Sequence, residues 1–417
     1  MVLESSTRRV RVLYTESNVD GTIGGSHYCL LHLVEHLDRA RFEPVVLFFE
    51  DHALVPSFRA AADTRVEPPP PPSQWGRGQQ PWAPVLALAR RAANLVRFGG
   101  RVRANMAFLR RNGIRLVHLN NSITRTQDWM WAAILAGVPY VVHERGLNDC
   151  YTAIDRAVAR RAALIVPMSR WIMDHMVERG VPSERIRVMY DGLDPASVAP
   201  ARSEQELRSL YDVRPGQPVV GIVGNIRRWK GQETVVRAMA RVVGHHPDAV
   251  CFLVGAATAA DQPYFEHLQQ IAAEAGITAN LRFTGYQQDP ASLVRMMQIV
   301  IHASVEPEPF GMVVLEAMAQ RKPVVGSRAG GVVEMVVEGE TGFTFPPGDA
   351  ETLAARVNDL LADPERARRM GEAGYERLME SFTMTRYMEQ VHEAYDSILS
   401  DRPLAPSAAA PASGHAQ

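Results

Sequence analysis

One pattern that starts twice constrains the fold of this chain most: a short apolar run, a glycine loop, a helical pattern and another apolar run. In the first half, residues 9–15 (RVRVLYT) lead into a loop with three glycines at 16–26, and the next apolar run is at 43–49. In the second half, residues 219–223 lead into the loop GNIRRWKG at 224–231. This order is typical of Rossmann-like units with parallel sheets. The sequence therefore predicts an α/β chain of two doubly wound, Rossmann-like domains that face each other across a cleft.

The expected domain boundaries lie where this alternation pauses. Residues 194–216 carry no strand pattern and are interpreted as the linker between the domains, and the strand before it is expected at 186–189. The predicted segments are a first domain at 1–195 completed by a C-terminal helix at 383–400, a second domain at 196–382, and a disordered low-complexity tail at 401–417.

The composition is ordinary for a globular protein that works in the cytoplasm. The chain has 417 residues, of which 46% are hydrophobic and 22% are charged, and its net charge is −1. It contains no apolar run long enough to span a membrane, and its N-terminus shows no signal peptide. Its 3 cysteines have neither metal-binding nor disulfide spacing, which fits a reducing compartment.

An arginine-rich segment at 68–127 stands out because it contains no acidic residue. It begins with a run of five prolines at 68–72, and Gly99 and Gly100 are expected to divide its helical part into two amphipathic pieces. The arginines could form the solvated face of a surface helix pair. Alternatively, they could dock on anionic lipid headgroups or bind an anionic acceptor. No aromatic and basic platform appears, so a nucleic acid partner is not expected.

The stretch 304–319 (SVEPEPFGMVVLEAMA) combines a strand end, a tight turn and a helix start. Pro309 and Gly311 break the periodicity, and Glu308 and Glu316 lie on either side of the turn. Ligands bind at such carboxyl ends of parallel strands, and the N–H groups of a helix start suit a phosphate or a polar sugar face. The two glutamates could be an acid/base pair, a nucleophile pair or acceptors for ligand hydroxyl groups.

A second candidate site is the loop GNIRRWKG, which places cationic residues between a strand and a helix. Lys230 is one of only two lysines in the chain, and Arg227 and Arg228 precede it. A diphosphate requires cations and free N–H donors together, and this loop can supply both. Adjacent side chains diverge, so the sequence does not decide which arginine contacts the phosphates.

Two further positions follow expected strands or glycine turns. His143 ends an apolar run and precedes a charged pair, so it is a candidate polar site residue. His118 ends another run and competes for the same role. Later in the chain, Gly330 and Gly331 allow close backbone approach in a turn that precedes Glu334.

Together, the order of these motifs resembles a known enzyme family. The sequence contains GTIGGS, VVHERG, YDGLD and VGNIRRWKG, followed by EPFGMVVLEAMAQRKPVVGSRAGGVVE and ETGFTFPPGD. This series is similar to that of the retaining, nucleotide-sugar-dependent glycosyltransferases of family 4, which have the GT-B fold. The resemblance extends from Arg11 to about Leu399, and the pattern E-x7-E around Pro-Phe-Gly is its most specific part.

The resemblance implies roles for residues of the second domain. Lys230 and an arginine of the same loop would hold the donor diphosphate. Glu308 would contact hydroxyl groups of the donor sugar, and Glu316 would bind the ribose. The backbone N–H groups of Phe310 and Gly311 would contact the sugar or a phosphate.

The remaining implied roles include one departure from the family pattern. Many members carry arginine directly after the first glycine of the phosphate loop, where this chain has Asn225, so Arg227 or Arg228 would substitute for it. The other residues implied in donor binding are Gly24 and Gly25 near the phosphate, His143 over the sugar and Glu334 near the nucleotide.

The resemblance also implies a reaction. A UDP-sugar or GDP-sugar would donate its sugar, with retention of configuration, to a hydroxyl group of a glycan or lipid-linked acceptor at the inner face of the membrane. Glu308, Lys230 and His143 would be the catalytic residues, and the cations would replace a metal ion, so no metal is expected. The alternatives are a nucleotide-sugar epimerase or hydrolase of the same fold, or a non-catalytic partner subunit.

Overall fold

The computed structural model describes residues 9–18, 23–67 and 83–402, and for residues 83–91 it describes only the backbone. The chain forms two compact units. Unit 1 comprises the described residues up to Met168, residues 172–189 and those from Met388 on, and unit 2 comprises residues 169–171 and 190–387. The proline run at 68–72, the rest of the arginine-rich segment up to 82, and residues 403–417 of the predicted tail lie outside the described residues.

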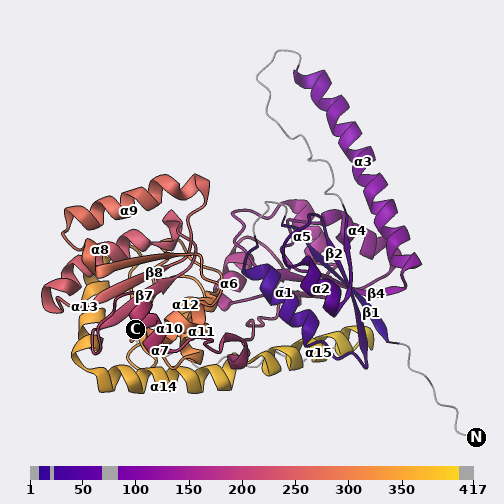
Figure 1. Ribbon diagram of the computed structural model, residues 1–417. Helices are drawn as coiled ribbons and strands as arrows, with labels where there is room; N and C mark the ends of the chain where they lie inside the picture. The colour runs from indigo at the N-terminus through magenta and orange to yellow at the C-terminus, as the bar shows by residue number, and fades with distance from the viewer. Residues whose placement is uncertain (1–8, 19–22, 68–82, 403–417) are drawn as a thin grey trace, which may run out of the picture. The chain divides into compact units, whose positions relative to one another are not determined.

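Unit 1 contains one six-stranded parallel sheet in the order β3-β2-β1-β4-β5-β6 (Figure 1). Its strands are β1 (Val10–Glu16), β2 (Phe42–Phe48), β3 (Asp63–Val66), β4 (Ile114–Leu119), β5 (Tyr140–Glu144) and β6 (Leu164–Pro167). Its helices are α1 (Gly25–Glu35), α2 (Val55–Ala61), α3 (Ala83–Arg111), α4 (Gln127–Ala136), α5 (Ala153–Ala159), most of α6 (Arg170–Glu178) and most of α15 (Met384–Leu399).

Unit 2 repeats this topology with the order β12-β11-β10-β7-β8-β9. Its strands are β7 (Val219–Val223), β8 (Val250–Val254), β9 (Leu281–Gly285), β10 (Ile299–His302), β11 (Val324–Ser327) and β12 (Gly342–Phe345). Its helices are α7 (Glu204–Leu210), α8 (Gln232–His245), α9 (Gln262–Glu274), α10 (Pro290–Met296), α11 (Met312–Ala319), α12 (Val332–Met335), α13 (Ala350–Ala362) and α14 (Pro364–Ser381). The two predicted Rossmann-like units are therefore confirmed.

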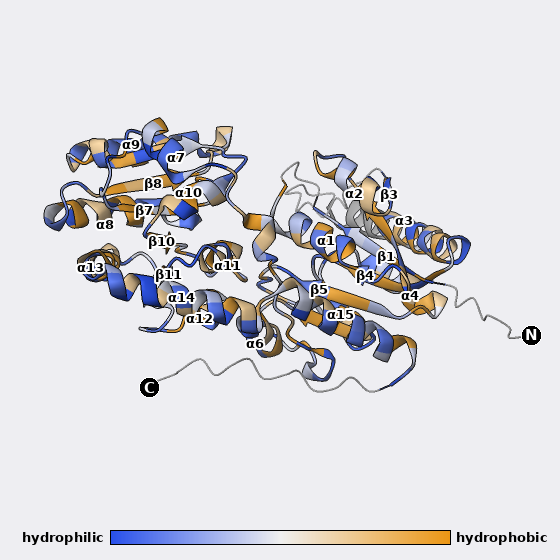
Figure 2. Cartoon of the chain, turned by 60° about the horizontal axis from the view of Figure 1, so that its bottom comes forward, coloured by the Kyte–Doolittle hydropathy of each residue, from blue (hydrophilic) through white to orange (hydrophobic). Residues whose placement is uncertain are grey.

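The strands form the centre of each unit because helices cover their sheets. A parallel strand that is buried on both faces reads as a continuous apolar run, and β1 and β8 are such runs. Val12, Leu13 and Tyr14 of β1 are fully buried, as are Phe252 and Leu253 of β8. In Figure 2 the strands β5 and β8 are coloured hydrophobic, whereas helices such as α9 and α14 carry a hydrophilic face.

The arginine-rich helix differs from the sequence prediction. Gly99 and Gly100 do not divide it, because α3 is one continuous helix of 29 residues that extends past α4 (Figure 1). Two glycines cost a helix only about 2 kcal/mol, which the surrounding helix-favouring residues and tertiary packing offset. The packing comes from the C-terminal part of α3, where Phe108 is buried edge-on against Trp129 of α4, with ring centroids 5.6 Å apart.

Two other expectations were wrong. Residues 186–189 form no strand, because only one isolated bridge joins Ile186 to Ile165, and Pro167 at the end of β6 has no N–H group to extend the ladder. The expected linker at 194–216 is not a bare connection either, because it contains α7, whose Leu207 is fully buried in unit 2. None of the helices in the described part of the chain combines the length and the apolar character that a membrane span requires.

Candidate active site

Each sheet has one position where the strand order reverses, and the predicted site residues follow the strands at these positions. In unit 1 the reversal lies between β1 and β4, and in unit 2 it lies between β7 and β10. Ligands of doubly wound sheets bind outside the carboxyl ends of the strands at such positions. The loop 224–231 follows β7, and Glu308 follows β10, so both belong to this edge of unit 2.

In unit 2, three side chains converge on the carboxylate of Glu308 and form with it what we call the Glu308 cluster: Lys230, His302, Ser304 and Glu308. Lys230 Nζ lies 2.5 Å from Glu308 Oε1. His302 Nε2 lies 2.6 Å from Oε2, and Ser304 Oγ donates to the same oxygen at 2.8 Å. The cluster thus joins the end of β10 to the loop after β7.

The loop after β7 reaches Glu308 because a glycine lets it approach β10 closely. Gly231 has φ 71° and is the N-cap of α8, and a Cβ atom there would lie only 1.9 Å from the carbonyl oxygen of Ala303. Val305 N–H donates to the carbonyl of Trp229 at 2.8 Å, which fastens the two loops together. The ammonium of Lys230 also lies 4.4 Å from the centroid of the Trp229 ring. Lys230 is therefore held in place by backbone packing.

The cluster keeps Glu308 ionised. Burial by itself would raise the pKa of Glu308, but the hydrogen bond and charge of His302 and the charge of Lys230 outweigh it and hold the pKa well below its usual value. A carboxyl group with so low a pKa cannot act as a general acid near neutral pH. The carboxylate can accept hydrogen bonds from a ligand, and it keeps a lysine positioned beside the turn that starts α11.

Helix α11 begins directly after the Pro-Phe-Gly turn. Gly311 is its N-cap with φ 96°, and Phe310 is buried, with its ring stacked on Tyr190 at 6.0 Å between centroids. Neither the Phe310 nor the Gly311 N–H group hydrogen-bonds to another described residue, so this helix start can serve an anionic ligand. Glu316 is half-buried two turns along, and burial raises its pKa, although the charge of Lys230 acts in the opposite direction.

The double glycine at 330–331 packs against the backbone of the Glu308 turn. Gly331 N–H donates to the carbonyl of Glu308 at 2.9 Å. A Cβ atom at Gly330 would lie 2.0 Å from that same oxygen. The close backbone approach that the sequence predicted is therefore made to the protein itself, and it fixes the turn that carries Glu308.

Glu334 has several hydrogen-bond partners within unit 2. Its carboxylate accepts from the N–H groups of Arg170 and Trp171, each at 3.0 Å, and from the hydroxyl of Tyr190 at 2.7 Å. It therefore stabilises the N-terminus of α6. Its expected role near the nucleotide stays a prediction.

The two arginines of the loop point to different partners. Arg227 Nε lies 3.8 Å from a carboxylate oxygen of Asp261, while the guanidinium of Arg228 lies 5.0 Å from the ring centroid of Tyr264. Arg228 is exposed and Arg227 is half-buried. The geometry confirms that adjacent side chains diverge here and does not decide which of them would reach a diphosphate.

In unit 1, Gly24 and Gly25 lie at the start of α1 and are exposed. Among the described residues, which exclude 19–22, no atom would lie within 4 Å of a Cβ atom at either glycine. The N–H group of Gly24 donates to Nδ1 of the buried His27 at 3.3 Å. The described surroundings of Gly24 and Gly25 are therefore less closely packed than those of Gly231 in unit 2.

Beside this helix, a polar network joins the carboxyl ends of β1, β4 and β5. The buried Glu16 accepts a hydrogen bond from Asn120 Nδ2 at 2.6 Å and another from Asn121 Nδ2. Arg145 donates to Asn120 Oδ1 at 2.9 Å. Asn120 also donates to the carbonyl of Ser26 at 3.1 Å, which links the network to α1. These residues make the edge of the sheet polar and rigid.

Next to it, Glu144 is a fully buried carboxyl group without a cation partner among its hydrogen bonds. Its oxygens accept from the N–H group of Ile123 at 3.0 Å and from Asn148 Nδ2 at 2.5 Å. Burial raises the pKa of Glu144 to about 7 despite these hydrogen bonds. The group is therefore partly neutral near pH 7.

His143 lies at the end of β5 and belongs to a chain of buried side chains, which we call the Tyr–His chain: Tyr14, Tyr395, His118 and His143. His143 Nδ1 lies 3.1 Å from His118 Nε2, and His118 Nδ1 lies 2.5 Å from the hydroxyl of Tyr395. Both histidines are neutral, because burial followed by the charge of Arg145 lowers the pKa of His118 to about 3 and that of His143 well below its usual value. The two histidines that competed in the sequence are therefore partners.

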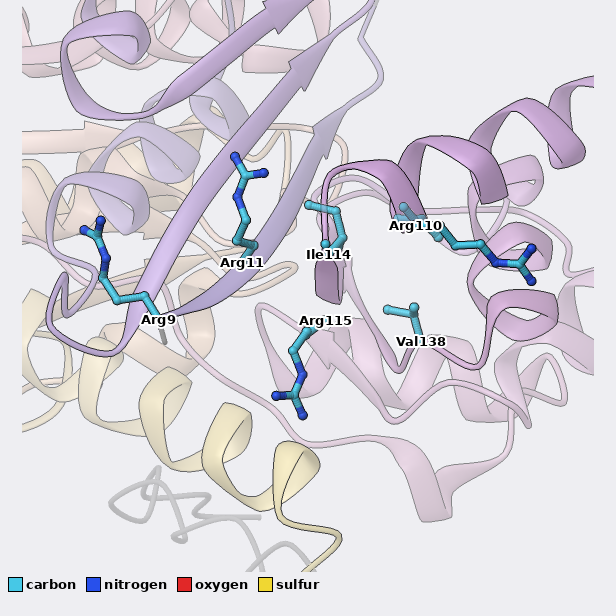
Figure 3. Close-up of a pocket in the computed structure, with 8 residues that line it drawn as sticks. Arg9, Arg11, Arg110, Ile114, Arg115 and Val138 are labelled. Atoms are coloured by element: carbon cyan, nitrogen blue, oxygen red, sulfur yellow. The ribbon is translucent and has the colours of Figure 1, made fainter. Parts of the chain in front are cut away.

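A separate hollow in unit 1 lies at the opposite end of the strands, where they begin. It has a volume of about 370 Å³ and lies where β1 and β4 begin (Figure 3). Arg9, Arg11, Arg110 and Arg115 line it, but their guanidinium groups point in different directions in Figure 3. Arg11 is paired with Glu43 at 3.2 Å. This hollow lacks the converging donors of an anion site.

Several residues of these arrangements were missed by sequence reasoning. His302 and Ser304 flank the end of an apolar run, and a single histidine there reads as part of a strand. Tyr190 begins the motif YDGLD, which does not by itself indicate a contact, and Tyr395 belongs to no motif. For His302, its place at the carboxyl end of a strand next to the E-x7-E stretch is a signal that could have identified it.

Comparison with known proteins identifies the family of the chain. Residues 24–192 match the family described as Glycosyl transferase 4-like domain, and residues 203–377 match Glycosyl transferases group 1. The alpha-maltose-1-phosphate synthase of Mycolicibacterium smegmatis is 30% identical over 300 residues, which cover 64% of this chain and 75% of that protein. This chain belongs to the group 1 glycosyltransferases of the family 4 type.

Other relatives of this glycosyltransferase are matched over a smaller share. The N-acetyl-alpha-D-glucosaminyl L-malate synthase of Bacillus anthracis is 30% identical over 57% of this chain, and the chain spans 60% of its length. The lipopolysaccharide core biosynthesis mannosyltransferase LpcC of Rhizobium leguminosarum bv. viciae is also 30% identical, again over 60% of its length.

Solved structures place the glycosyltransferase in the GT-B fold. Anabaena Alr3699/HepE in complex with UDP superposes with a TM-score of 0.76 at 24% identity, covering 94% of this chain and 100% of that chain. A glycosyltransferase from Rickettsia africae ESF-5 gives a TM-score of 0.78 at 18% identity, with coverages of 94% and 99%. The fold expected from the sequence is thereby confirmed.

Proposed function

We propose that this glycosyltransferase moves a sugar from a UDP-sugar or GDP-sugar to a hydroxyl group of a glycan or lipid-linked acceptor, with retention of configuration. The observation that carries the proposal is the Glu308 cluster, in which Lys230 is held 2.5 Å from an ionised carboxylate beside the N-terminus of α11. The presence of UDP in the related Anabaena structure supports a nucleotide diphosphate donor. Relatives named for lipopolysaccharide core synthesis support an acceptor in cell-surface glycoconjugate synthesis.

In this mechanism, electrostatic stabilisation does most of the work. Lys230, with Arg227 or Arg228, stabilises the negative charge that develops on the leaving diphosphate. The N–H groups of Phe310 and Gly311 add donors at the helix start. The role that a metal ion has in other glycosyltransferases falls to these cations.

Glu308 then acts as a carboxylate, since its pKa is far too low for proton donation. Its oxygens accept hydrogen bonds from hydroxyl groups of the donor sugar, and its negative charge stabilises an oxocarbenium-like transition state. Glu316, whose pKa is raised, contacts the ribose hydroxyl groups. In unit 1, Gly24 and Gly25 leave space for the donor phosphate, and His143 positions the sugar.

A donor screen on two variants tests this proposal. UDP-, GDP- and ADP-sugars are added to the wild type, and the shift in melting temperature is measured, because a ligand that binds only the folded state stabilises it. Lys230→Ala should abolish the shift and lower transfer about 10²–10³-fold. Lys322→Ala changes the only other lysine of the chain and serves as the control.

The products discriminate between the proposed reaction and its alternatives. Transfer to the acceptor with the donor's anomeric configuration, seen by NMR, supports the proposal. Rapid epimerisation or stoichiometric hydrolysis of the donor without an acceptor would favour the epimerase or hydrolase alternative. A Lys230→Ala variant with the wild-type melting shift and transfer rate would overturn the site assignment, and the absence of any turnover would favour a non-catalytic partner subunit.

We also propose that α3 contacts an anionic membrane surface, which would place a cytoplasmic enzyme at the inner face of the membrane. Leu95 and Val96 are 71% and 75% exposed, and the adjacent Arg97 and the more distant Arg103 are exposed too. Apolar side chains next to cations suit the boundary between acyl chains and anionic headgroups. Arg101 contributes less, since it is paired with Asp128 at 3.2 Å.

Vesicle pelleting tests this second part. The wild type should pellet with vesicles that contain anionic lipid, and less so at high salt, because screening weakens the arginine contacts. Leu95→Ser with Val96→Ser should reduce pelleting, whereas Leu210→Ser, which changes a leucine of unit 2 that is 62% exposed, should not. Equal pelleting at low and high salt would exclude docking through the arginines, no pelleting would exclude lipid docking altogether, and either result would leave the catalytic proposal unaffected.

A further inference from the structure

We propose that Tyr395 and His118 are positioning residues that fix the tautomer of His143, and thereby decide whether Nε2 of His143 donates or accepts a hydrogen bond toward a sugar hydroxyl. This inference rests on the proposed function, because it assigns His143 to the donor sugar. It extends that function to a residue of α15, which is 277 positions away from His118 in the sequence.

The Tyr–His chain is continuous from strand to helix. The hydroxyl of Tyr395 donates to the hydroxyl of Tyr14 at 3.1 Å. Tyr395 in turn meets His118 Nδ1 at 2.5 Å, and His118 Nε2 meets His143 Nδ1 at 3.1 Å. All four side chains are at most 1% exposed, so water does not compete for these hydrogen bonds.

The directions of the hydrogen bonds in the Tyr–His chain depend on one another. A neutral imidazole has one N–H donor and one acceptor nitrogen, so the two hydrogen bonds of His118 must run in the same direction along the chain. If His118 Nδ1 donates to Tyr395, its Nε2 must accept from Nδ1 of His143. The other direction reverses every hydrogen bond of the chain. The hydroxyl of Tyr395 therefore determines the tautomers of both histidines.

The hydrogen bond from Tyr395 to Tyr14 selects one of the two directions. Because the Tyr395 hydroxyl donates its hydrogen bond to Tyr14, its oxygen accepts a hydrogen bond from His118 Nδ1–H. His118 Nε2 then accepts from His143 Nδ1–H, which leaves Nε2 of His143 as the unprotonated nitrogen of its ring. An unprotonated nitrogen accepts a hydrogen bond from a sugar hydroxyl group, and it cannot donate a hydrogen bond to one.

The packing around the chain keeps it in place. The ring of Tyr395 meets Phe42 edge-on at 5.5 Å, and the rings of His118 and His143 stack at 5.3 Å. Tyr395 is fully buried on α15. Removing its hydroxyl therefore takes away the hydrogen bond and leaves the ring contacts, which makes Tyr395→Phe a clean test.

The test is ¹⁵N NMR of the ring nitrogens in the full-length protein labelled at histidine, with His143→Gln and His118→Gln spectra used for assignment. In the wild type, Nδ1 of His143 should be protonated and Nε2 should not. Tyr395→Phe removes the acceptor for His118 Nδ1, so both histidines should shift toward the other tautomer. Tyr14→Phe, which removes the acceptor for Tyr395, should shift them in the same direction and serves as the second variant if the first does not fold.

Tyr140→Phe is the matched control. Its hydroxyl is also buried in unit 1, but it donates to the carbonyl of Val158, so its loss should leave the histidine spectrum unchanged. In transfer assays, Tyr395→Phe should lower kcat/KM about tenfold, as expected for one misdirected hydrogen bond, while Tyr140→Phe should not.

The outcomes separate this inference from the proposed function. A tautomer shift in Tyr395→Phe together with slower transfer supports the positioning role. An unchanged His143 tautomer in that variant overturns it, whatever the activity. A shifted tautomer with wild-type transfer also overturns it, because His143 would then have no part in sugar binding. The first of these two results leaves the proposed function untouched, and the second removes only the role of His143 from it, because the donor screen with Lys230→Ala tests the donor site of unit 2 separately.

Discussion

The two units share one topology, but the histidines at corresponding strand ends have different partners: an ionised carboxylate in unit 2 and neutral side chains in unit 1. Both sheets reverse their strand order at β1/β4 and β7/β10, and a histidine lies near the end of both β4 and β10. His302 of β10 contacts an ionised glutamate, and Lys230 contacts the same carboxylate. His118 of β4 is buried and neutral, with a histidine and a tyrosine as partners.

This difference shows that the side chains at the strand ends, and not the fold, decide what each unit can bind. The carboxyl end of the sheet in unit 2 carries the charged side chains of Lys230 and Glu308, which suit the diphosphate of the proposed donor. In unit 1, the corresponding edge carries neutral imidazoles, amides and a carboxyl group whose pKa is raised to about 7, beside Glu16 and Arg145, which both bind the amide of Asn120. Such groups suit hydroxyl groups of a sugar, which are neutral hydrogen-bonding partners.

The largest effect is expected when the charge of unit 2 is removed. Glu308→Gln keeps the shape of the side chain but deprives Lys230 and His302 of their shared carboxylate, so transfer should fall about 10²–10³-fold in steady-state kinetics. Glu306→Gln, an exposed neighbour, is the control. If Glu308→Gln transferred sugar within twofold of the wild-type rate, the charged site of unit 2 would not be the catalytic one.

A second prediction compares the glycines at the two helix starts. Gly231→Ala would place a Cβ atom 1.9 Å from the carbonyl oxygen of Ala303 at a φ of 71°, so we expect a loss of about 3 kcal/mol of unfolding free energy. Gly25→Ala meets open space and should change the stability by less than about 1 kcal/mol. Urea denaturation measures both, and equal losses would show that the two loops are packed alike.

The sequence predicts features of these loops that depend on neighbouring residues, but not contacts between residues that are far apart in the chain. The repeated strand, glycine loop and helix pattern is local, and it predicted both Rossmann-like units. Lys230 and Glu308 could each be placed at the carboxyl end of a strand by the same local pattern. That the two side chains meet, across 78 residues, follows only from the closeness of Gly231 to Ala303.

The features that the sequence did not predict depend on contacts without a local pattern. Tyr395 on α15 reads as an ordinary apolar position, although it bonds to His118. The continuity of α3 through Gly99 and Gly100 depends on tertiary packing at its C-terminal part, which propensity does not include. The prediction of a strand at 186–189 was wrong because Pro167, on the neighbouring strand, has no N–H group to donate a hydrogen bond.

A third prediction concerns the buried carboxyl group of unit 1. Burial raises the pKa of Glu144 from 4.5 to about 7, so the folded state holds its proton more tightly than the unfolded state does. Below pH 4.5 both states are protonated and the wild type carries no penalty. Between 4.5 and 7 the unfolded state ionises first, so the contribution of Glu144 to the unfolding free energy falls as pH rises, by at most about 3 kcal/mol in total.

Glu144→Gln should remove this dependence. Its unfolding free energy relative to the wild type should therefore increase from acid pH to pH 7 and then level off, as measured by urea denaturation across that range. Glu35→Gln, which changes an exposed glutamate of the same unit, should follow the wild-type curve. A constant difference between Glu144→Gln and the wild type would mean that Glu144 is ionised like a surface residue, and the contrast between the two units would be weaker.

The smallest effect is expected at Glu334, whose carboxylate forms no ion pair with a described residue. Its oxygens accept from the N–H groups of Arg170 and Trp171 and from Tyr190, so the negative charge is balanced by the N-terminus of α6. Glu334→Gln removes that charge and turns one acceptor into a donor, which should cost about 1–2 kcal/mol in urea denaturation. Glu340→Gln, at an exposed position, is the control. If Glu334→Gln instead kept full stability but weakened donor binding, Glu334 would act on the nucleotide, and it would belong to the donor site together with Glu308 and Glu316.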